Sequence, residues 1–467
     1  MSKFLWKGEQ VIGIINGHGP SDWSASGVSI DTRTLKKGDI FFALAGPNYD
    51  GHQFISSAIK KGASIVISNA PSLAFKDKVI IVSDVFNALI SLGRFSRKRN
   101  KGKIIAITGS SGKTTVKEML ALSLSKSGKI HYSEASYNNK IGVSLSLSRM
   151  PIDSDFSIFE LGMNNAGEIS YLSNLVEPHI ALINNTGNAH IGNLNSKKEI
   201  EKAKMEIVSG ITSNGKLIIN ENISLSSYPK KLFENKNLKI LKFGYKKNSN
   251  FILEKYLYSS GLSLIDATIN RTNISYSLKA PGSHMAMNSI AVIGVCFLLG
   301  VSPDVSKQTI SNFESMDGRG KIHDLSIMGK KIEVIDESYN ANPESTKSSI
   351  NLLSEIDFLK SKRKILVFGD MLELGNFSKE MHIDIASFIN ESDVDLVFCI
   401  GSEIKNLWDN LILSKRGYHS IDPEILISSL KNKLKENDLV LIKGSSKSGI
   451  KIIFNALMEE QLNRNIA

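Results

Sequence analysis

Cysteine is scarce in this sequence, and no apolar run is long. Among 467 residues there are two cysteines, Cys296 and Cys399, each of which lies inside an apolar segment. Two thiols placed in this way make neither a metal site nor a disulfide framework, and they fit a reducing cytoplasm. The longest apolar run, 290–301, is shorter than the roughly 20 residues that a membrane-spanning helix needs. Lys7 and Glu9 interrupt any signal-peptide core, so we expect a cytoplasmic protein without a membrane span.

Arginine-rich blocks that alternate with aromatic residues are also missing, although the formal net charge is +11. The positive charge is mostly lysine, scattered over what look like exposed helix faces, which argues against a nucleic-acid groove. Such a field would still favour an anionic substrate that carries a nucleotide. The chain also lacks internal repeats and low-complexity tracts, and its length predicts two to four globular domains.

What the sequence does contain is a phosphate-binding pattern, KIIAITGSSGKTTVKE, at 103–118. Residues 103–108 are apolar and β-branched and suit a buried strand, whereas the segment 109–112 must leave that strand in a tight loop. Lys113 then opens an amphipathic helix, so that backbone N–H groups and the positive end of the helix dipole surround one point. We expect a polyphosphate there, with Lys113 reaching the β- and γ-phosphates and the Thr114 hydroxyl binding Mg²⁺.

This pattern is a shorter form of the general G-x-x-x-x-G-K-[ST] loop, because Ile107 stands where the first glycine belongs. The plain alternative is a glycine turn followed by a helix whose lysine is solvated. A buried strand that feeds GSSGKTT directly is much rarer than a glycine turn, so the phosphate loop is the better interpretation.

Strand and helix patterns divide the chain into three α/β domains. Residues 1–100 are predicted to form a smaller α/β domain, 101–314 a doubly wound sheet domain that holds the phosphate loop, and 315–467 a Rossmann-like domain. The basic stretch 96–103, SRKRNKGK, is predicted to be the linker between the first two domains. In the first domain, Arg33 suits a phosphate because its guanidinium fork matches phosphate oxygens, although a lone arginine is more often a surface residue.

Polar side chains follow several predicted strands of the middle domain. Ligands of open α/β sheets bind at the carboxyl ends of the strands, so Glu160 beside the phosphate loop is a candidate Mg²⁺ ligand. His190, in a loop after another strand, is a candidate for a second metal ion or a phosphate. The amides of Asn138 and Asn139 would either hydrogen-bond a substrate or form a turn. Lys204 lies in a charged helix, where the pattern alone indicates a solvated face.

The last domain repeats this plan with its own polar clusters. Its predicted strands run into DESYNANPES at 336–345, GDMLELG at 369–375 and KGS at 443–445. Strands of one sheet that end in polar clusters define a ligand crevice along one edge, so we expect a second binding site here.

These motifs together resemble those of the Mur ligases of bacterial cell-wall synthesis, and the resemblance runs nearly from end to end. The segments TGSSGKTT at 108–115, ELG at 160–162 and HIG at 190–192 are similar to segments shared across a wider family that includes folylpolyglutamate synthase. AKMEI at 203–207 resembles a family segment whose lysine is carbamylated to make a Mg²⁺ ligand.

Other segments resemble one particular branch of that family. DESYNANPES, and GDMLELG followed by His382, are similar to the member that adds D-alanyl-D-alanine to UDP-N-acetylmuramoyl-tripeptide. DTR at 31–33 and NYDGHQF at 48–54 resemble the uridine-nucleotide domain of that member and of its predecessor in the pathway.

The resemblance implies that the chain uses ATP to form an amide bond through an acyl phosphate. The implied substrates are UDP-N-acetylmuramoyl-tripeptide, bound by the first domain, and D-alanyl-D-alanine, bound by the third. The implied catalytic residues are Lys113, Glu160, His190 and a carbamylated Lys204, and two Mg²⁺ ions would be held by Thr114, Glu160, His190 and Lys204. The residues expected to bind ATP are Gly109, Ser110, Ser111, Gly112, Lys113, Thr114, Thr115, Asn288, Arg319 and Asp336. Those expected to bind the other substrates are Thr32, Arg33, Asp50, His52, Asn138, Asn139, Tyr339, Asn340, Asn342 and Asp370.

Three other functions compete with this one. Folylpolyglutamate synthase shares the wider family but not the YNANP segment or the uridine-type first domain. A kinase or GTPase would leave the third domain unexplained, and no guanine-reading motif is evident. A non-catalytic binding module would not explain why potential metal ligands recur at strand ends. We expect a monomer that binds no nucleic acid.

Overall fold

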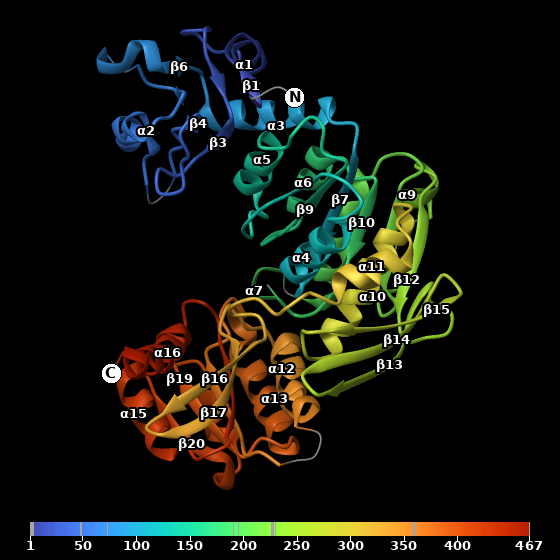
Figure 1. The fold of residues 1–467 in the computed structure, drawn as a ribbon, viewed down its shortest axis with the longest axis vertical. Helices are drawn as coiled ribbons and strands as arrows, with labels where there is room; N and C mark the ends of the chain where they lie inside the picture. The colour runs from blue at the N-terminus through green and yellow to red at the C-terminus, as the bar shows by residue number, and fades with distance from the viewer. Residues whose placement is uncertain are drawn as a thin grey trace.

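The computed structural model describes residues 4–46, 49–71, 73–189, 191–194, 196–225, 228, 230–357 and 361–466. These residues form three α/β units that follow one another along the long axis of the molecule, with the middle unit between the other two (Figure 1). The predicted α/β fold is therefore confirmed. None of the helices within the described ranges has the length and apolarity to cross a membrane.

The first unit is built on a parallel sheet with the strand order β3-β4-β5-β6. Ile40, Phe42, Ile65 and Ile67 lie in its core, as expected for β-branched and aromatic residues in buried strands. The elements of this unit are β1 (Trp6–Lys7), α1 (Gly8–Ile15), β2 (Ser24–Ala25), β3 (Gly27–Ser29), β4 (Asp39–Phe42), α2 (Ile55–Lys60), β5 (Ile65–Ser68), β6 (Val79–Ile81) and α3 (Val85–Arg99).

Helix α3 joins the first unit to the second, and the linker predicted over 96–103 is wrong. The helix continues to Arg99, and Ser96 and Arg97 are buried rather than exposed. Arg97 donates from Nε to the carbonyl oxygen of Val176 (2.7 Å) and from its second terminal nitrogen to that of Glu177 (2.8 Å). A cation therefore satisfies carbonyl groups at the end of another helix, which a polar linker would not do.

The central sheet has the strand order β15-β14-β13-β12-β11-β10-β7-β9-β8. The strands from β13 to β8 in this order pair in parallel, with β7 between β10 and β9, whereas β13, β14 and β15 pair antiparallel. Its strands are β7 (Lys103–Thr108), β8 (Ile130–Tyr132), β9 (Phe156–Glu160), β10 (Ile180–Ile183), β11 (Lys216–Asn220), β12 (Lys239–Gly244), β13 (Phe251–Ser259), β14 (Leu262–Ile269) and β15 (Thr272–Leu278). Its helices are α4 (Lys113–Leu124), α5 (Lys140–Ser148), α6 (Glu168–Val176), α7 (Ile191–Leu194), α8 (Lys197–Met205), α9 (Lys231–Glu234), α10 (Ser283–Leu298) and α11 (Pro303–Ile310).

Strand β7 marks the point at which the order of the central sheet reverses. After β7 the chain adds β8 and β9 on one side and then crosses to place β10 on the other side of β7. A reversal of this kind leaves a crevice at the carboxyl end of the strand, because the following helices leave toward opposite faces. The phosphate loop, which begins at Gly109, lies at this crevice.

The third unit has the strand order β16-β17-β21-β18-β19-β20, in which only β16 and β17 pair antiparallel. Its elements are β16 (Lys321–Ile327), β17 (Lys330–Glu337), α12 (Pro343–Ile356), β18 (Lys364–Gly369), α13 (Ser378–Glu391), β19 (Leu396–Ile400), α14 (Lys405–Asn410), β20 (Arg416–Ser420), α15 (Pro423–Lys433), β21 (Leu439–Lys443) and α16 (Ile450–Ile466).

Helices α10 and α7 of the second unit both contact the third unit. Helix α10 has Gly282 as its N-cap and no cap from a side chain of its own. The carboxylate of Glu355, in α12, instead accepts from the backbone N–H and the hydroxyl of Ser283 (2.8 and 2.7 Å). In the second contact, α7 approaches the third unit so closely that a Cβ on Gly192 would lie 2.7 Å from the backbone nitrogen of Gly375.

Replacing Arg97 tests the junction between α3 and α6. We expect Arg97→Met to lower the stability of the central unit by about 2 kcal/mol, since two buried carbonyl groups would lose a charged donor. Thermal unfolding followed by circular dichroism measures this. Lys98→Met, at an exposed position of the same helix, is the matched control, and equal melting of both variants would show that the junction does not depend on Arg97.

Candidate active site

The phosphate loop lies between the end of β7 and the start of α4, where the sequence predicts it. Gly112, the N-cap of α4, has a φ of 76°, a left-handed conformation that favours glycine. A Cβ there would also lie 2.6 Å from the amide nitrogen of Asn184. Because no side chain caps α4, the first N–H groups of the helix remain suited to an anion.

Residues at the end of β10 brace this loop. The Asn185 side-chain oxygen accepts from the backbone N–H of Ser111 (2.9 Å), and the Ser110 hydroxyl donates to the carbonyl of Gly187 (3.0 Å). Asn184 donates to the side-chain oxygen of Asn288 on α10 (2.9 Å). Sequence reasoning gave Asn184 and Asn185 no role, although two amides directly after a strand of the same sheet were a usable signal.

Lys113 folds back across the loop, where its Nζ donates to the carbonyl of Gly109 (2.7 Å). Burial lowers the pKa of the Lys113 ammonium, the nearby Glu160 carboxylate raises it, and Arg319 lowers it. The lysine therefore lies at the phosphate loop with a carboxylate and a second cation close by.

Glu160, the last residue of β9, is 2% exposed and faces the start of α4. One of its oxygens accepts from the Thr114 hydroxyl (2.9 Å) and the other from the Asn138 amide (2.8 Å). The predicted strand-end carboxylate and the predicted loop hydroxyl are thus brought into direct contact.

The loop that carries Asn138 is held by Lys117, a buried residue of α4. Its Nζ donates to the carbonyl oxygens of Ser133 and Ala135 (2.5 and 3.2 Å). The same loop places the Ser136 hydroxyl 3.1 Å from that of Thr114. Sequence reasoning gave neither Lys117 nor Ser136 a role, because their positions depend on packing between α4 and the loop after β8.

The third unit reaches this point through Tyr339 and Arg319. The Tyr339 hydroxyl donates to that of Ser136 (3.2 Å), and the Arg319 guanidinium lies 3.8 Å from the centre of the Tyr339 ring. Asp336 is buried, and its carboxylate accepts from the N–H groups of Gly318 and Ser338 (2.7 and 3.0 Å). Asp336 thereby fixes the two turns that present Arg319 and Tyr339, and its contact with a nucleotide stays a prediction.

These contacts enclose a cleft of about 680 Å³ between the second and third units. From the second unit the cleft is lined by the phosphate loop and the strand ends, including Ser110, Ser111, Gly112, Lys113, Thr114, Thr115, Ser136, Asn138, Glu160 and Asn288. From the third unit it is lined by Arg319, Tyr339, Asn340, Asn342, Ser345, Glu373 and Lys443, among others.

Lys204 lines a smaller cavity of about 110 Å³, together with Gly109, Lys113 and Asn138. Lys113 and Asn138 also line the larger cleft, so the two spaces are neighbours. Lys204 is 2% exposed, which corrects the solvated face that the charge pattern indicates. Burial lowers its pKa well below the usual value, and Lys113 lowers it further, which favours an uncharged amine.

Other predicted residues serve the local structure. Asn139 caps α5 by accepting from the N–H of Gly142 (2.9 Å), and Asn342 caps α12 by accepting from that of Ser345 (2.9 Å). Asp370 accepts from the N–H of Ile404 (2.8 Å) and is not among the residues that line the cleft. Its predicted contact with a substrate stays a prediction.

The predicted residues of the first unit lie outside the cleft. Arg33, exposed at the surface, pairs with Asp31 (2.6 Å), and the His52 ring lies 2.6 Å from the carboxylate of Asp50. The backbone carbonyl of Thr32 accepts from Lys61 (2.7 Å). His190 lies outside the described residues, and no cluster of three histidine, cysteine or acidic side chains suited to a metal ion occurs within them.

Three family models match successive parts of the chain. They are described as the Mur ligase family catalytic domain, over residues 24–94, the Mur ligase middle domain, over 107–296, and the Mur ligase, glutamate ligase domain, over 318–446. Together they span most of the sequence.

Relatives of known name match along nearly the whole chain. A UDP-N-acetylmuramoyl-tripeptide–D-alanyl-D-alanine ligase of Rickettsia prowazekii is 34% identical over 431 residues, which cover 91% of this chain and 93% of that protein. The protein of the same name from Escherichia coli is 30% identical, and the match covers 96% of this chain and 98% of that protein. The crystal structure of MurF from Acinetobacter baumannii superimposes with a TM-score of 0.85 at 26% identity. The superposition covers 97% of this chain and 99% of that one.

The close approach of Gly192 and Gly375 leads to a prediction about how the two units fit together. In Gly192→Ala, the new methyl group would lie 2.7 Å from the backbone of the third unit, which must then move away. We expect a larger radius of gyration in small-angle X-ray scattering. Gly13→Ala, where a Cβ meets nothing within 4 Å, is the control, and an unchanged radius for Gly192→Ala would contradict the close fit.

Proposed function

The chain belongs to the Mur ligase family, and we propose that it uses ATP to join D-alanyl-D-alanine to UDP-N-acetylmuramoyl-tripeptide in peptidoglycan synthesis. One observation carries this proposal. The contact between Thr114 and Glu160 at the phosphate loop opens onto a cleft that the third unit closes with Arg319 and Tyr339. A triphosphate in that cleft would have its reacting end between the second unit and the third, and the third unit would bring the dipeptide.

The nucleotide is proposed to lie over the phosphate loop. The N–H groups at the start of α4 and the Lys113 ammonium would meet the phosphate oxygens, while Asn288 and Arg319 would contact other parts of ATP. Positive groups placed where negative charge grows usually supply the largest share of catalysis. Lys113 would release the Gly109 carbonyl when phosphate offers it a stronger acceptor.

The residues present fit Mg²⁺. Magnesium prefers oxygen ligands, and the Thr114 hydroxyl and the Glu160 carboxylate offer two buried oxygens 2.9 Å apart beside the loop. We propose that they hold one ion, and that His190 and a carbamylated Lys204 hold a second. Bound there, the ions would neutralise phosphate charge and orient the acyl oxygen.

Carbamylation of Lys204 is supported by its surroundings. An ammonium group cannot be a metal ligand, whereas the uncharged amine reacts with carbon dioxide to give a carbamate with anionic oxygens. Lys204 is buried with a pKa well below the usual value, and no hydrogen bond or ion pair ties its Nζ to another described residue. The amine is therefore available for this modification.

The reaction proceeds in two steps. The terminal carboxylate of the tripeptide attacks the γ-phosphorus, the bond to ADP breaks, and an acyl phosphate forms. The deprotonated amine of the dipeptide then attacks the acyl carbon, which forms the amide and releases phosphate. Closure of the cleft by Tyr339 and Arg319 would keep water from the acyl phosphate.

The remaining substrate contacts are proposed from the resemblance to the Mur ligases. Thr32, Arg33, Asp50 and His52 of the first unit would hold the uridine nucleotide, and Asn138 and Asn139 the peptide beyond it. Asn340 and Asn342 would hold the incoming dipeptide. We expect the enzyme to act as a monomer in the cytoplasm.

We expect Lys113→Ala to abolish turnover, because the γ-phosphate would lose the cation that lies at the loop. Phosphate release is measured with UDP-N-acetylmuramoyl-tripeptide and D-alanyl-D-alanine, and with other amines in place of the dipeptide. Lys126→Ala, at an exposed position just after α4, is the control. Near-normal ligation by Lys113→Ala would refute the nucleotide site, and preference for another amine would refute the proposed substrate.

We expect Lys204→Ala to lose activity and to regain part of it with a short carboxylate such as acetate, because the added anion would supply the missing oxygen ligand. Lys113→Ala should not respond to acetate, since it lacks a cation instead. Mass spectrometry of the native protein at high bicarbonate should show the mass of one carbamate. Absence of both the rescue and the added mass would contradict carbamylation.

A further inference from the structure

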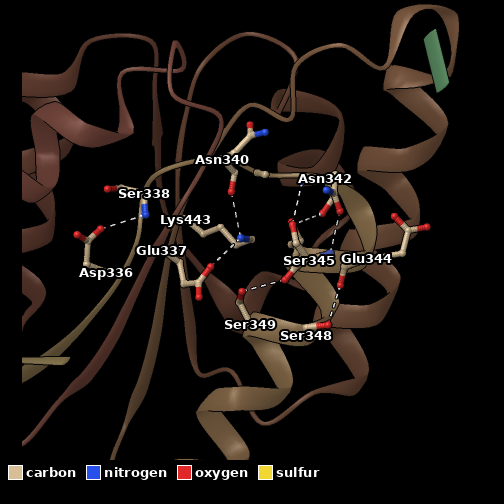
Figure 2. A network of polar contacts seen from close by, with 12 residues as sticks. Asp336, Glu337, Ser338, Asn340, Asn342, Glu344, Ser345, Ser348, Ser349 and Lys443 are labelled. Atoms are coloured by element: carbon tan, nitrogen blue, oxygen red, sulfur yellow. Dashed lines mark hydrogen bonds and ion pairs between the residues drawn. The ribbon is translucent and has the colours of Figure 1, made fainter. Parts of the chain in front are cut away.

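Lys443 is a buried cation that the proposed mechanism does not use. It is the last residue of β21, it is 1% exposed, and it lines the cleft. Figure 2 shows its side chain reaching between Glu337, the last residue of the neighbouring strand β17, and Asn340, which lies in the loop after that strand. The ammonium thus lies on the third unit's side of the cleft, beside the loop that carries Tyr339.

The hydrogen bonds of Lys443 leave part of its capacity unused. Its Nζ donates to the Glu337 carboxylate and to the backbone carbonyl of Asn340, both at 3.2 Å. Charge-assisted hydrogen bonds are usually about 2.7–2.9 Å, and an ammonium has three N–H donors. Among the described residues, the third donor of Lys443 has no acceptor. The Glu337 carboxylate partners the buried lysine, while the remaining N–H can take a further anion.

The other basic groups of the cleft have different positions or charges. Lys113 and Arg319 lie at the phosphate end, next to Glu160 and to Tyr339 respectively. Lys197 is at the exposed start of α8. Burial lowers the pKa of His284, so that its ring is mostly uncharged near neutral pH. Among the described residues that line the cleft, Lys443 is therefore a buried cation for which the triphosphate has no use.

Lys443 lines the same cleft as the phosphate loop, from the side of the third unit. Asn340, whose carbonyl Lys443 contacts, directly follows Tyr339, and Tyr339 reaches Ser136 and, through it, Thr114 at the phosphate loop. A dipeptide whose amine lay at the reacting carbon beyond Tyr339 would have its carboxylate directed back toward the third unit, the side from which Lys443 lines the cleft.

We propose that Lys443 binds the carboxylate of the incoming D-alanyl-D-alanine and thereby selects an acceptor that ends in a free acid. This inference rests on the proposed function, because it assigns one end of the second substrate. The substrate carboxylate supplies the acceptor that the third N–H of Lys443 lacks. The ammonium would then have hydrogen bonds to the Glu337 carboxylate, the Asn340 carbonyl and the substrate. An amine without that carboxylate would leave Lys443 incompletely paired in a buried place, which disfavours its binding.

The test compares the dipeptide with its C-terminal amide on two enzymes. On the native enzyme, the amide should lower kcat/KM roughly ten- to a hundredfold, because a hydrogen bond to a charged group is lost. In Lys443→Met, kcat/KM for the free acid should fall by a similar factor. The kcat/KM values for the acid and the amide should then differ by less than about threefold. The KM values for ATP and for the tripeptide substrate should change little.

Controls separate binding from folding. Lys443→Met leaves the Glu337 carboxylate buried without its partner, so the double variant Lys443→Met/Glu337→Met removes that charge as well and should show the same loss of selectivity. Lys443→Arg should keep the preference for the acid, and so should Lys451→Met at an exposed position of α16. Thermal melting reports whether each variant is folded.

The outcomes are distinguishable. If the native enzyme produces no ADP with tripeptide and dipeptide together, the proposed function fails. If it is active but accepts acid and amide equally, or if both methionine variants keep the native preference for the acid, the function stands and the assignment of Lys443 is overturned. Lys443 would then serve only to hold the Asn340 loop against β21.

Discussion

The hydrogen bond between Thr114 and Glu160 is the contact on which the rest of the cleft depends. It joins the start of α4 to the end of β9, two elements that meet because β9 pairs with β7, the strand that precedes α4. From this pair, further hydrogen bonds reach Asn138 on one side and Ser136 on the other. Ser136 in turn meets Tyr339, so the third unit is aligned on the same pair of oxygens.

Both sheets present the carboxyl ends of parallel strands to one space. In the central sheet those ends carry the phosphate loop and Glu160, and in the third sheet they carry Tyr339, Asn340 and Lys443. Each sheet alone would offer an open crevice at its edge. Together the two crevices line one shared cleft, in which a phosphate donor and an amine could meet.

Local signals predicted the parts of the site that depend on short segments. The strand, the glycine loop and the start of α4 lie within one stretch of chain, and Glu160 follows its strand directly, so both could be placed from the sequence. The direction of a strand-end side chain could not be predicted, because it depends on the loops around it. Asp336 and Asp370 end strands as expected, but both turn toward backbone N–H groups.

Burial of charge was the other feature that sequence patterns missed. Lys204 and Arg97 lie in segments rich in lysine and arginine, which indicated solvated surfaces. Their burial follows from partners that are distant in the sequence. Lys204 lies beside a cavity lined by Gly109 and Lys113 of the phosphate loop. Arg97 donates to carbonyl groups about eighty residues away. Periodicity within a segment carries no information about such partners.

The capping of α10 by Glu355 links the thermodynamics of the second and third units. A helix N-terminus without a cap is less stable by about 1 kcal/mol, and here the capping carboxylate belongs to another unit. Any outward movement of the third unit would therefore also loosen the first turn of the helix from which Asn288 lines the cleft. Opening of the cleft and fraying of that helix would be coupled.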